Sequence, residues 1–208
     1  MSNLDFPVLC KNIPQSGTKW FKHFFAQLLR AQGWHIEGKI PNIPKAVIIV
    51  APHTSNIDAW FSFLTVLALD LKITILAKHT LFVTPFDKLM RWFGMMPVNR
   101  DHPQGLTEHL IKEIATQERI WIAMSPEGTR KQAKQWKSGF YRIAKAAHIP
   151  IIMIALDYRH KTIRILGQKI CTDEYQQDMQ EILMAYQGNF SAKNPLQLSD
   201  PLRLINVK

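Results

Sequence analysis

The sequence has few cysteines, no long apolar run and no recognisable secretory signal peptide at its N-terminus. Its two cysteines, Cys10 and Cys171, lie far apart and form no CxxC pair. A disulfide framework is therefore not expected, and a reduced, cytosol-facing protein is. The N-terminal residues lack the charged and apolar regions of a secretory signal peptide. The most apolar uncharged run, residues 59–69, is far shorter than the roughly 20 residues that a transmembrane helix needs, so we expect no bilayer-spanning segment.

Negative charge is scarce as well. The chain has 26 Lys and Arg against 16 Asp and Glu, which gives a formal net charge of +10. Such a balance predicts a polyanionic partner. Nucleic acid, an anionic membrane surface and an acidic carrier protein all satisfy this prediction, and charge alone does not choose among them. With 208 residues, 47% of them hydrophobic, the chain can form one domain with a substantial core.

Residues 18–34 have the pattern of an amphipathic helix that carries no acid. Aromatic residues and leucines recur there at helical spacing, and the remaining positions hold Lys, His, Gln and Arg. No acidic residue occurs between Lys11 and Ile36. An aromatic apolar face opposite a cationic face suits the bilayer interface, although an ordinary helix packed on the domain would show the same periodicity. We assign residues 1–40 to an amphipathic membrane-surface segment.

From residue 41 onward, short β-branched runs alternate with helical patterns. Strands are expected at residues 46–51, 73–77, 120–124, 151–156 and 162–166. Helices are expected at residues 57–69, 86–93, 103–117, 140–147 and 172–186. The alternation predicts an α/β fold with a mainly parallel sheet flanked by helices, and we expect residues 41–208 to form that single domain. The end of the chain, from Gln187 onward, contains two prolines and no clear period, which favours a loosely packed tail.

The first strand is followed by the segment PHTSNID, residues 52–58. On a continuous helix, residues five apart differ in direction by about 140°, so His53 and Asp58 converge only if the chain turns between them. Ser55 and Asn56 are residues that favour such a turn. An ionised carboxylate would then orient the imidazole and support the charge that it gains as a general base. The same spacing also fits a capped helix beside a loop histidine with no catalytic role.

Three further segments follow in order. Residues 77–100 begin with AK and end with GMMPVNR, residues 125–130 read SPEGTR, and residues 149–152 read IPII. With PHTSNID, these segments resemble the four sequence blocks of the glycerolipid acyltransferases, and especially of the lysophosphatidic acid acyltransferase family of phospholipid biosynthesis. The resemblance extends over about half of the chain, and its most specific part is the SPEGTR block.

The resemblance implies an O-acyltransferase reaction. His53 would deprotonate a hydroxyl of a lysolipid, most simply lysophosphatidic acid, and that hydroxyl would attack an acyl thioester. Asp58 would orient His53, and Arg100 would hold the phosphate of the acceptor, with help from Lys78. The other residues of the implied acceptor site are Glu127, Gly128, Thr129 and Arg130.

The same resemblance implies no metal and no cofactor, because the thioester of acyl-coenzyme A or of an acyl carrier protein is already activated. The other histidines show no ligand spacing with cysteines or paired acids. The expected partners are an anionic membrane surface, the lysolipid acceptor and the acyl donor, but no nucleic acid. We accordingly expect the protein to lie on the cytoplasmic face of a membrane as a peripheral, monotopic enzyme.

Two alternatives stay open. Asn99 stands where the second block of the family usually has an acidic residue, which favours a different hydroxyl-bearing lipid as the acceptor. The net charge would also fit a basic, non-catalytic module that binds a membrane or nucleic acid. In residues 18–34, however, the aromatics share an apolar face, and this arrangement suits lipid better than nucleic acid.

Overall fold

The computed structural model describes residues 9–17, 19–98 and 105–206. The strands are β1 (His35–Glu37), β2 (Lys45–Ala51), β3 (Ile73–Lys78), β4 (Met95–Val98), β5 (Ile120–Met124), β6 (Ile151–Asp157) and β7 (Thr162–Lys169). The α-helices are α1 (Lys19–Ala31), α2 (Asn56–Ala68), α3 (Phe86–Trp92), α4 (Leu106–Thr116), α5 (Gly139–Ala146), α6 (Tyr175–Tyr186) and α7 (Asp200–Ile205). Short 3-10 helices are η1 (His79–Leu81) and η2 (Pro195–Gln197).

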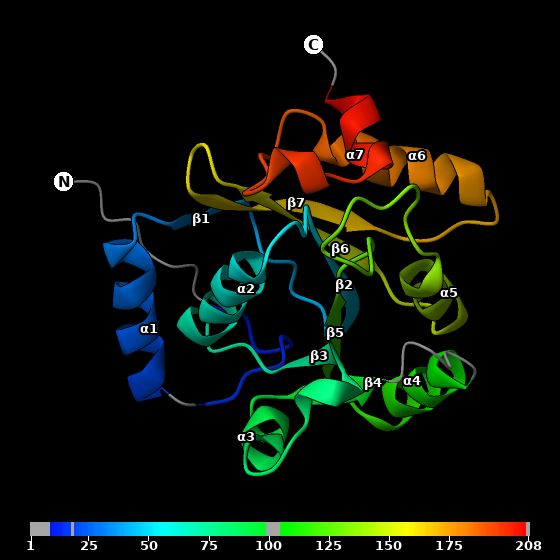
Figure 1. The fold of residues 1–208 in the computed structure, drawn as a ribbon. Coiled ribbons are helices and arrows are strands. Elements are labelled where there is room, and N and C mark those ends of the chain that lie inside the picture. Colours follow the sequence, from blue (N-terminus) through cyan, green and yellow to red (C-terminus); the bar gives the residue numbers. More distant parts are fainter. Residues whose placement is uncertain (1–8, 18, 99–104, 207–208) are drawn as a thin grey trace.

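The strands form one sheet in the order β1-β7-β6-β2-β5-β3-β4 (Figure 1). Neighbouring strands run parallel except for the antiparallel pair β6–β7. After Lys45, the central strand β2 is an uninterrupted apolar run, as expected for a strand that is covered on both faces. The predicted α/β fold with a mainly parallel sheet flanked by helices is therefore confirmed.

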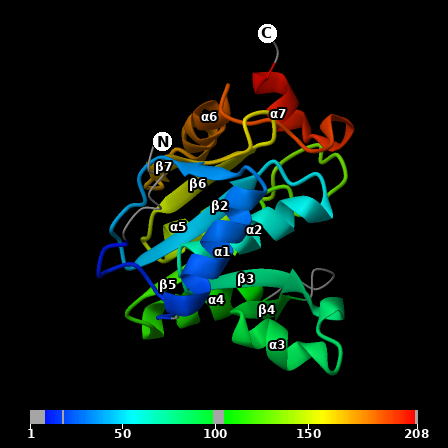
Figure 2. The same ribbon diagram turned by 90° about the vertical axis from the view of Figure 1, so that its left-hand side faces the viewer.

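Helices cover both faces of the sheet. The helices α1 and α2 lie on one face, and α4, α5 and α6 lie on the other (Figure 1). Along β2, Val47 and Ile49 pack toward α5 and α6, while Ala46 and Ile48 face the opposite layer. The carboxyl ends of β2, β3, β4, β5 and β6 point to one edge, where the first turn of α2 and the C-terminal helix α7 also lie (Figure 2). Ligands of parallel α/β sheets bind at this kind of edge.

The N-terminal helix is packed on the domain by one side only. In α1, Leu29 is fully buried against α2, whereas Phe21 and Phe24 are 51% and 60% exposed. Trp34, which follows the helix, is buried, and β1 joins the sheet beside β7. Residues from α1 to β1 thus contribute to the core and also display two phenylalanines. The division of the chain at residue 40 stays a prediction.

The strands and helices expected from residue 41 onward are present with shifted ends, and the helix expected at residues 103–117 is described from Leu106. Two short strands, β1 and β4, were not predicted. The strand β1 is too short to show a periodicity. The strand β4 contains Pro97, which argues against a strand unless the strand lies at a sheet edge, and β4 is indeed the edge strand.

The C-terminal segment, residues 187–206, is well packed, so the predicted loose tail is wrong. Phe190, Leu198 and Leu202 are buried in the core on the α5 and α6 side. The two prolines do not disrupt this packing, because each lies at the start of a short helix, in η2 and in α7. Proline is tolerated there, since the first amides of a helix have no partner within it. Helices this short do not produce a readable sequence period.

The packing of this segment predicts unequal effects for two leucines of α7. Leu202 is fully buried, whereas Leu204 is 76% exposed. The substitution Leu202→Ala should lower the free energy of unfolding by about 2–5 kcal/mol, and Leu204→Ala should change it by less than about 0.5 kcal/mol. Urea denaturation of both variants measures this difference. Equal, small effects would show that the segment is not part of the core.

Candidate active site

His53 and Asp58 meet after a reversal of the chain. His53 lies in the loop between β2 and α2, and Asp58 lies in the first turn of α2. Ser55 is the N-cap and has extended backbone angles, so the chain changes direction between the two residues. As a result, Nδ1 of His53 lies 3.8 Å from Oδ2 of Asp58. This contact is an ion-pair contact and is longer than a hydrogen bond.

The carboxylate of Asp58 is fully buried and surrounded by donors. Its Oδ2 accepts the backbone N–H groups of Thr54 at 2.5 Å and Ser55 at 2.7 Å. Its Oδ1 accepts the hydroxyls of Ser55 at 2.9 Å and Tyr158 at 2.5 Å. These bonds satisfy a group that would be costly to bury alone, and they fix the plane of the carboxylate beside His53. The His53 side chain is 23% exposed, so a ligand can reach the imidazole.

Glu127 holds the loop between β2 and α2 through a hydrogen bond. It lies just after β5, is buried, and accepts the backbone N–H of His53 at 2.5 Å and the hydroxyl of Ser199 at 2.8 Å. Burial raises the pKa of Glu127 to about 6, although the Ser199 and His53 hydrogen bonds oppose this rise and the charge of Asp58 adds to it. The carboxylate thus joins the loop after β2 to the C-terminal segment, and it is not among the groups that line the cavity described below.

Gly128, Thr129 and Arg130 lie beside this carboxylate. Gly128 has a φ of +65°, and a Cβ at this position would lie 2.7 Å from Cε of Lys137. Only glycine therefore allows the Lys137 side chain to lie against this turn. Arg130 donates a hydrogen bond to the Asn56 side chain at the start of α2. The SPEGTR and PHTSNID segments are thus in direct contact.

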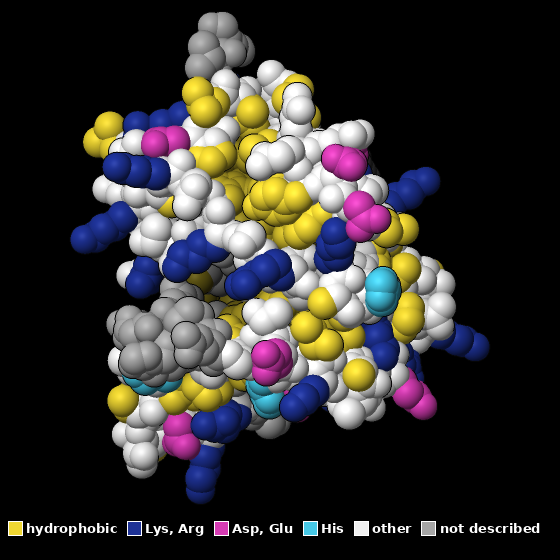
Figure 3. Space-filling model, turned by 90° about the vertical axis from the view of Figure 1, so that its right-hand side faces the viewer, with side chains coloured by type: hydrophobic (Ala, Val, Ile, Leu, Met, Phe, Trp, Pro, Cys, Tyr) yellow, Lys and Arg dark blue, Asp and Glu magenta, His cyan; other side chains and the backbone are white. Residues whose placement is uncertain are grey.

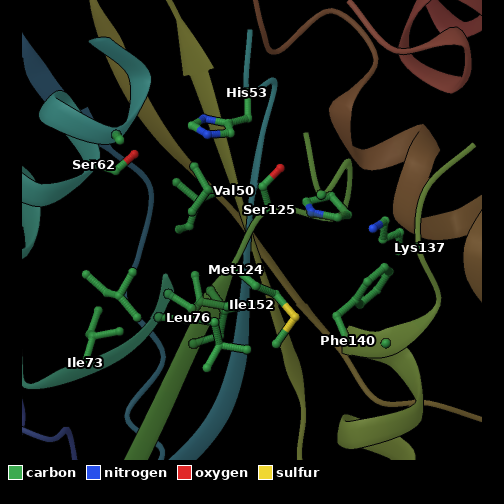
Figure 4. Close-up of a pocket in the computed structure, with 18 of the residues that line it drawn as sticks. Val50, His53, Ser62, Ile73, Leu76, Met124, Ser125, Lys137, Phe140 and Ile152 are labelled. Atoms are coloured by element: carbon green, nitrogen blue, oxygen red, sulfur yellow. The ribbon is translucent and has the colours of Figure 1, made fainter. Parts of the chain in front are cut away.

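A cavity of about 1540 Å³ opens beside His53 and is lined from both faces of the sheet, by residues of α2 on one face and of α5 on the other. Its polar part includes Ser125, Lys137 and the Gly128–Arg130 turn, and Ser62 of α2 lies on its wall. Figure 4 shows His53 at one end and apolar side chains toward the other. The apolar lining shown there includes Val50, Ile73, Leu76, Met124 and Ile152. The cavity therefore has a polar end, which holds His53 and the cationic side chains of Arg130 and Lys137, and a deep apolar interior.

Several cations line this cavity: Arg130, Lys131, Lys137 and Arg142. Figure 3 shows Lys and Arg side chains around an apolar hollow on the face that carries α4 and α5. Arginine and lysine bind phosphate oxygens well, arginine with a planar pair of donors. The polar end can consequently bind a ligand that carries phosphate.

The side chains of two residues expected in the acceptor site, Arg100 and Lys78, are not described. Arg100 lies outside the described residues, as does Asn99. Lys78 is the last residue of β3, but its side chain also lies outside the described part of the structure. Their binding roles stay predictions. Within residues 9–17, 19–98 and 105–206, no group of three or more His, Cys, Asp or Glu side chains is arranged to hold a metal ion.

Residues of the site that the sequence did not indicate come from distant parts of the chain. Tyr158 follows β6, and Ser199 precedes α7. Neither belongs to a sequence block or to a periodic pattern that would single it out. Lys137 is one of the many Lys and Arg residues of the chain, and its contact with Gly128 depends on the fold.

The family model described as Acyltransferase matches residues 35–157, which include both the PHTSNID and the SPEGTR segments. The match extends over more than half of the chain. The chain belongs to this acyltransferase family. The protein is therefore an acyltransferase, and the family recognised from the four sequence blocks is confirmed.

A solved structure is also similar to this acyltransferase: the 1-acyl-sn-glycerophosphate (LPA) acyltransferase PlsC from Thermotoga maritima. The two structures align with a TM-score of 0.58 and 13% sequence identity over 82% of this chain and 77% of that chain. At this identity the likeness establishes a common fold. A search of curated protein sequences found no significant match.

The raised pKa of Glu127 predicts a pH effect on stability. Because the folded protein binds this proton more tightly than the unfolded chain, protonation of Glu127 stabilises the fold fully below about pH 4.5, and this contribution is lost as the pH rises through about 6. The loss amounts to about 2 kcal/mol at 1.36 kcal/mol per pH unit. Glu127→Gln keeps the shape of the side chain and removes the titration.

Urea denaturation of both proteins at several pH values between 4 and 7 checks this expectation. Wild type should lose stability relative to Glu127→Gln as the pH rises. The comparison cancels the contributions of the other titrating carboxylates, which both proteins share. A difference that stays constant across the range would contradict the placement of a buried, titrating carboxylate at this position.

Proposed function

We propose that this acyltransferase moves a fatty acyl group from a thioester to a hydroxyl of a lysophospholipid-like acceptor, most simply lysophosphatidic acid, with His53 as the general base. The observation that carries the proposal is the convergence of His53 and Asp58 at the cationic end of a cavity whose interior is apolar. An acyl acceptor of this kind has the same polarity, with a phosphate, a hydroxyl and a hydrocarbon chain.

The geometry supports a simple sequence of proton and acyl transfers. Nδ1 of His53 faces Asp58, so Nε2 is the ring nitrogen that takes the proton of the acceptor hydroxyl. The oxygen then attacks the carbonyl carbon of the thioester. As the C–S bond breaks, the leaving thiolate takes the proton back from His53. Asp58 stabilises the imidazolium between these two steps. An ester and a free thiol are formed, and no metal or cofactor takes part.

The apolar interior of the cavity supports a fatty acyl substrate. Val66 of α2 lines one wall, and Val50, Ile75 and Ile154 of the sheet line the other. These side chains are only partly buried, so a hydrocarbon chain placed between them would remove apolar surface from water. Each buried methylene group would contribute about 0.8 kcal/mol.

The polar end supports phosphate-bearing substrates. Gly128, Thr129 and Arg130 line the cavity and can contact the acceptor, with Lys78 and Arg100 as further candidates. Glu127 would act differently from the expectation, because its carboxylate holds the backbone of His53 and the hydroxyl of Ser199. It would shape the acceptor site indirectly, by holding the loop that carries His53. Acyl-coenzyme A and acyl carrier protein both carry a phosphate at the far end of the pantetheine arm that bears the thioester, so the cationic lining suits either donor.

Exposed apolar side chains on two adjacent helices support association with a membrane. Phe21 and Phe24 of α1 and Ile57 and Trp60 of α2 are all largely exposed, and the two helices contact each other. None of the described helices has the length and apolarity needed to cross a bilayer. We infer that this surface rests on the anionic, cytoplasmic face of a membrane. The first turn of α2 would then bring His53 close to the lipid acceptor.

Replacement of the proposed base should abolish the reaction. His53→Ala should lower the rate of thiol release from an acyl thioester by about 100- to 10,000-fold with lysophosphatidic acid as the acceptor. His109→Ala, which changes an exposed histidine of α4, should retain the wild-type rate. A panel of lysolipids in the same assay identifies the preferred acceptor. Full activity of His53→Ala would refute the proposed mechanism.

The proposed membrane surface can be tested by exchanging its aromatic residues. Deletion of the N-terminal segment is unsuitable, because it would also remove the buried Leu29 and Trp34. The double substitution Phe21→Ser and Phe24→Ser should instead weaken binding to vesicles of phosphatidylglycerol and phosphatidylethanolamine and leave the unfolding temperature nearly unchanged. Met184→Ser, which changes a half-exposed residue of α6, serves as the control. Equal vesicle binding of all three proteins in a flotation assay would rule out this role.

A further inference from the structure

The hydroxyl of Tyr158 contacts the catalytic carboxylate proposed above. It donates to Oδ1 of Asp58 at 2.5 Å, whereas His53 lies nearest to Oδ2. The two partners therefore occupy different oxygens of the same carboxylate. Burial and the bond to Asp58 raise the pKa of Tyr158 well above its usual value, so the phenol stays protonated and acts as a donor at every physiological pH.

The ring of Tyr158 is held by aromatic residues from two other elements. Trp34 packs edge-on against Tyr158 with the ring centroids 5.0 Å apart, and Phe61 of α2 packs edge-on at 6.2 Å. Trp34 and Phe61 in turn stack at 4.2 Å. On the remaining side, Nζ of Lys193 lies 5.8 Å from the ring centroid. Aromatic contacts of this kind restrict the orientation of a ring, and here they direct the hydroxyl toward Asp58.

We propose that Tyr158 is a positioning residue for the His53–Asp58 pair, and that Trp34 connects the N-terminal segment to the active site by fixing the Tyr158 ring. The phenol holds Oδ1, and this bond turns Oδ2 toward His53. The inference rests on the proposed general-base role of His53.

The proposal makes a specific prediction for Tyr158→Phe, which removes the hydroxyl and keeps the ring contacts. Asp58 would still accept the bonds from Thr54 and Ser55, so the fold should persist. Without the phenol, Oδ2 is no longer held toward His53, so the carboxylate stabilises the imidazolium less well. The midpoint of the His53 titration should then fall by about half a pH unit. Among the described residues, the charged or titratable groups near the pair include Glu127, Lys193 and Arg130.

Nuclear magnetic resonance of protein with 13C-labelled histidine measures this midpoint without any substrate, and the His53 signal is assigned from its absence in His53→Gln. The acyl-transfer assay adds a second measurement. The kcat of Tyr158→Phe should fall about 10-fold with little change in KM, because the loss affects the base and not the binding of substrates.

The chain offers a matched control in a second buried tyrosine–aspartate pair. Tyr141 donates to Oδ2 of Asp178 at 2.8 Å, and Tyr141→Phe should reduce stability without moving the His53 midpoint or kcat. In a background of Asp58→Asn, Tyr158→Phe should cause no further loss of rate. An unchanged midpoint and kcat in Tyr158→Phe, or the same shifts in Tyr141→Phe, would overturn the positioning role alone. Full activity of His53→Ala would instead refute the underlying mechanism.

Discussion

The structure of the site depends on one buried carboxylate. Asp58 is inaccessible to water, so the surrounding chain must supply donors for it, and it does so from the loop after β2 and from Tyr158 after β6. The backbone N–H donors of Thr54 and Ser55 require the tight turn that places His53 over the strand. The tyrosine requires β6 to lie beside β2, as it does in the sheet. The geometry of the imidazole is therefore a consequence of satisfying Asp58.

The C-terminal segment closes the same site from the opposite side. Ser199 donates to Glu127 and accepts from the indole of Trp136, and the backbone N–H of Asn194 donates to the hydroxyl of Thr54. These bonds connect the loops after β2 and β5 to a part of the chain that follows the family blocks. The two carboxylates thus have separate tasks: Asp58 faces the imidazole, and Glu127 anchors the loop that carries it.

The sequence predicted the features that depend on residues close together in the chain. It did not predict the contacts between residues far apart in the chain. Strands such as β2 and helices such as α2 follow from local patterns, and the reversal between His53 and Asp58 agrees with the turn that Ser55 and Asn56 favour. The contacts of Tyr158 and Ser199 join residues that are far apart in the chain, so no local pattern predicts them. The packed C-terminal segment was missed because its helices are too short to show a period. The described residues do not test the roles implied for Arg100 and Lys78.

The central claim is that acyl transfer takes place where the imidazole of His53 meets the apolar cavity beside it. A crystal structure with an S-alkyl pantetheine, a non-cleavable thioether that mimics the part shared by both donors, tests this most directly. We expect the alkyl chain among Val50, Ile152 and the neighbouring apolar residues, with the carbon next to sulfur beside His53. An alkyl chain bound outside this cavity, or a sulfur remote from the imidazole, would contradict the account.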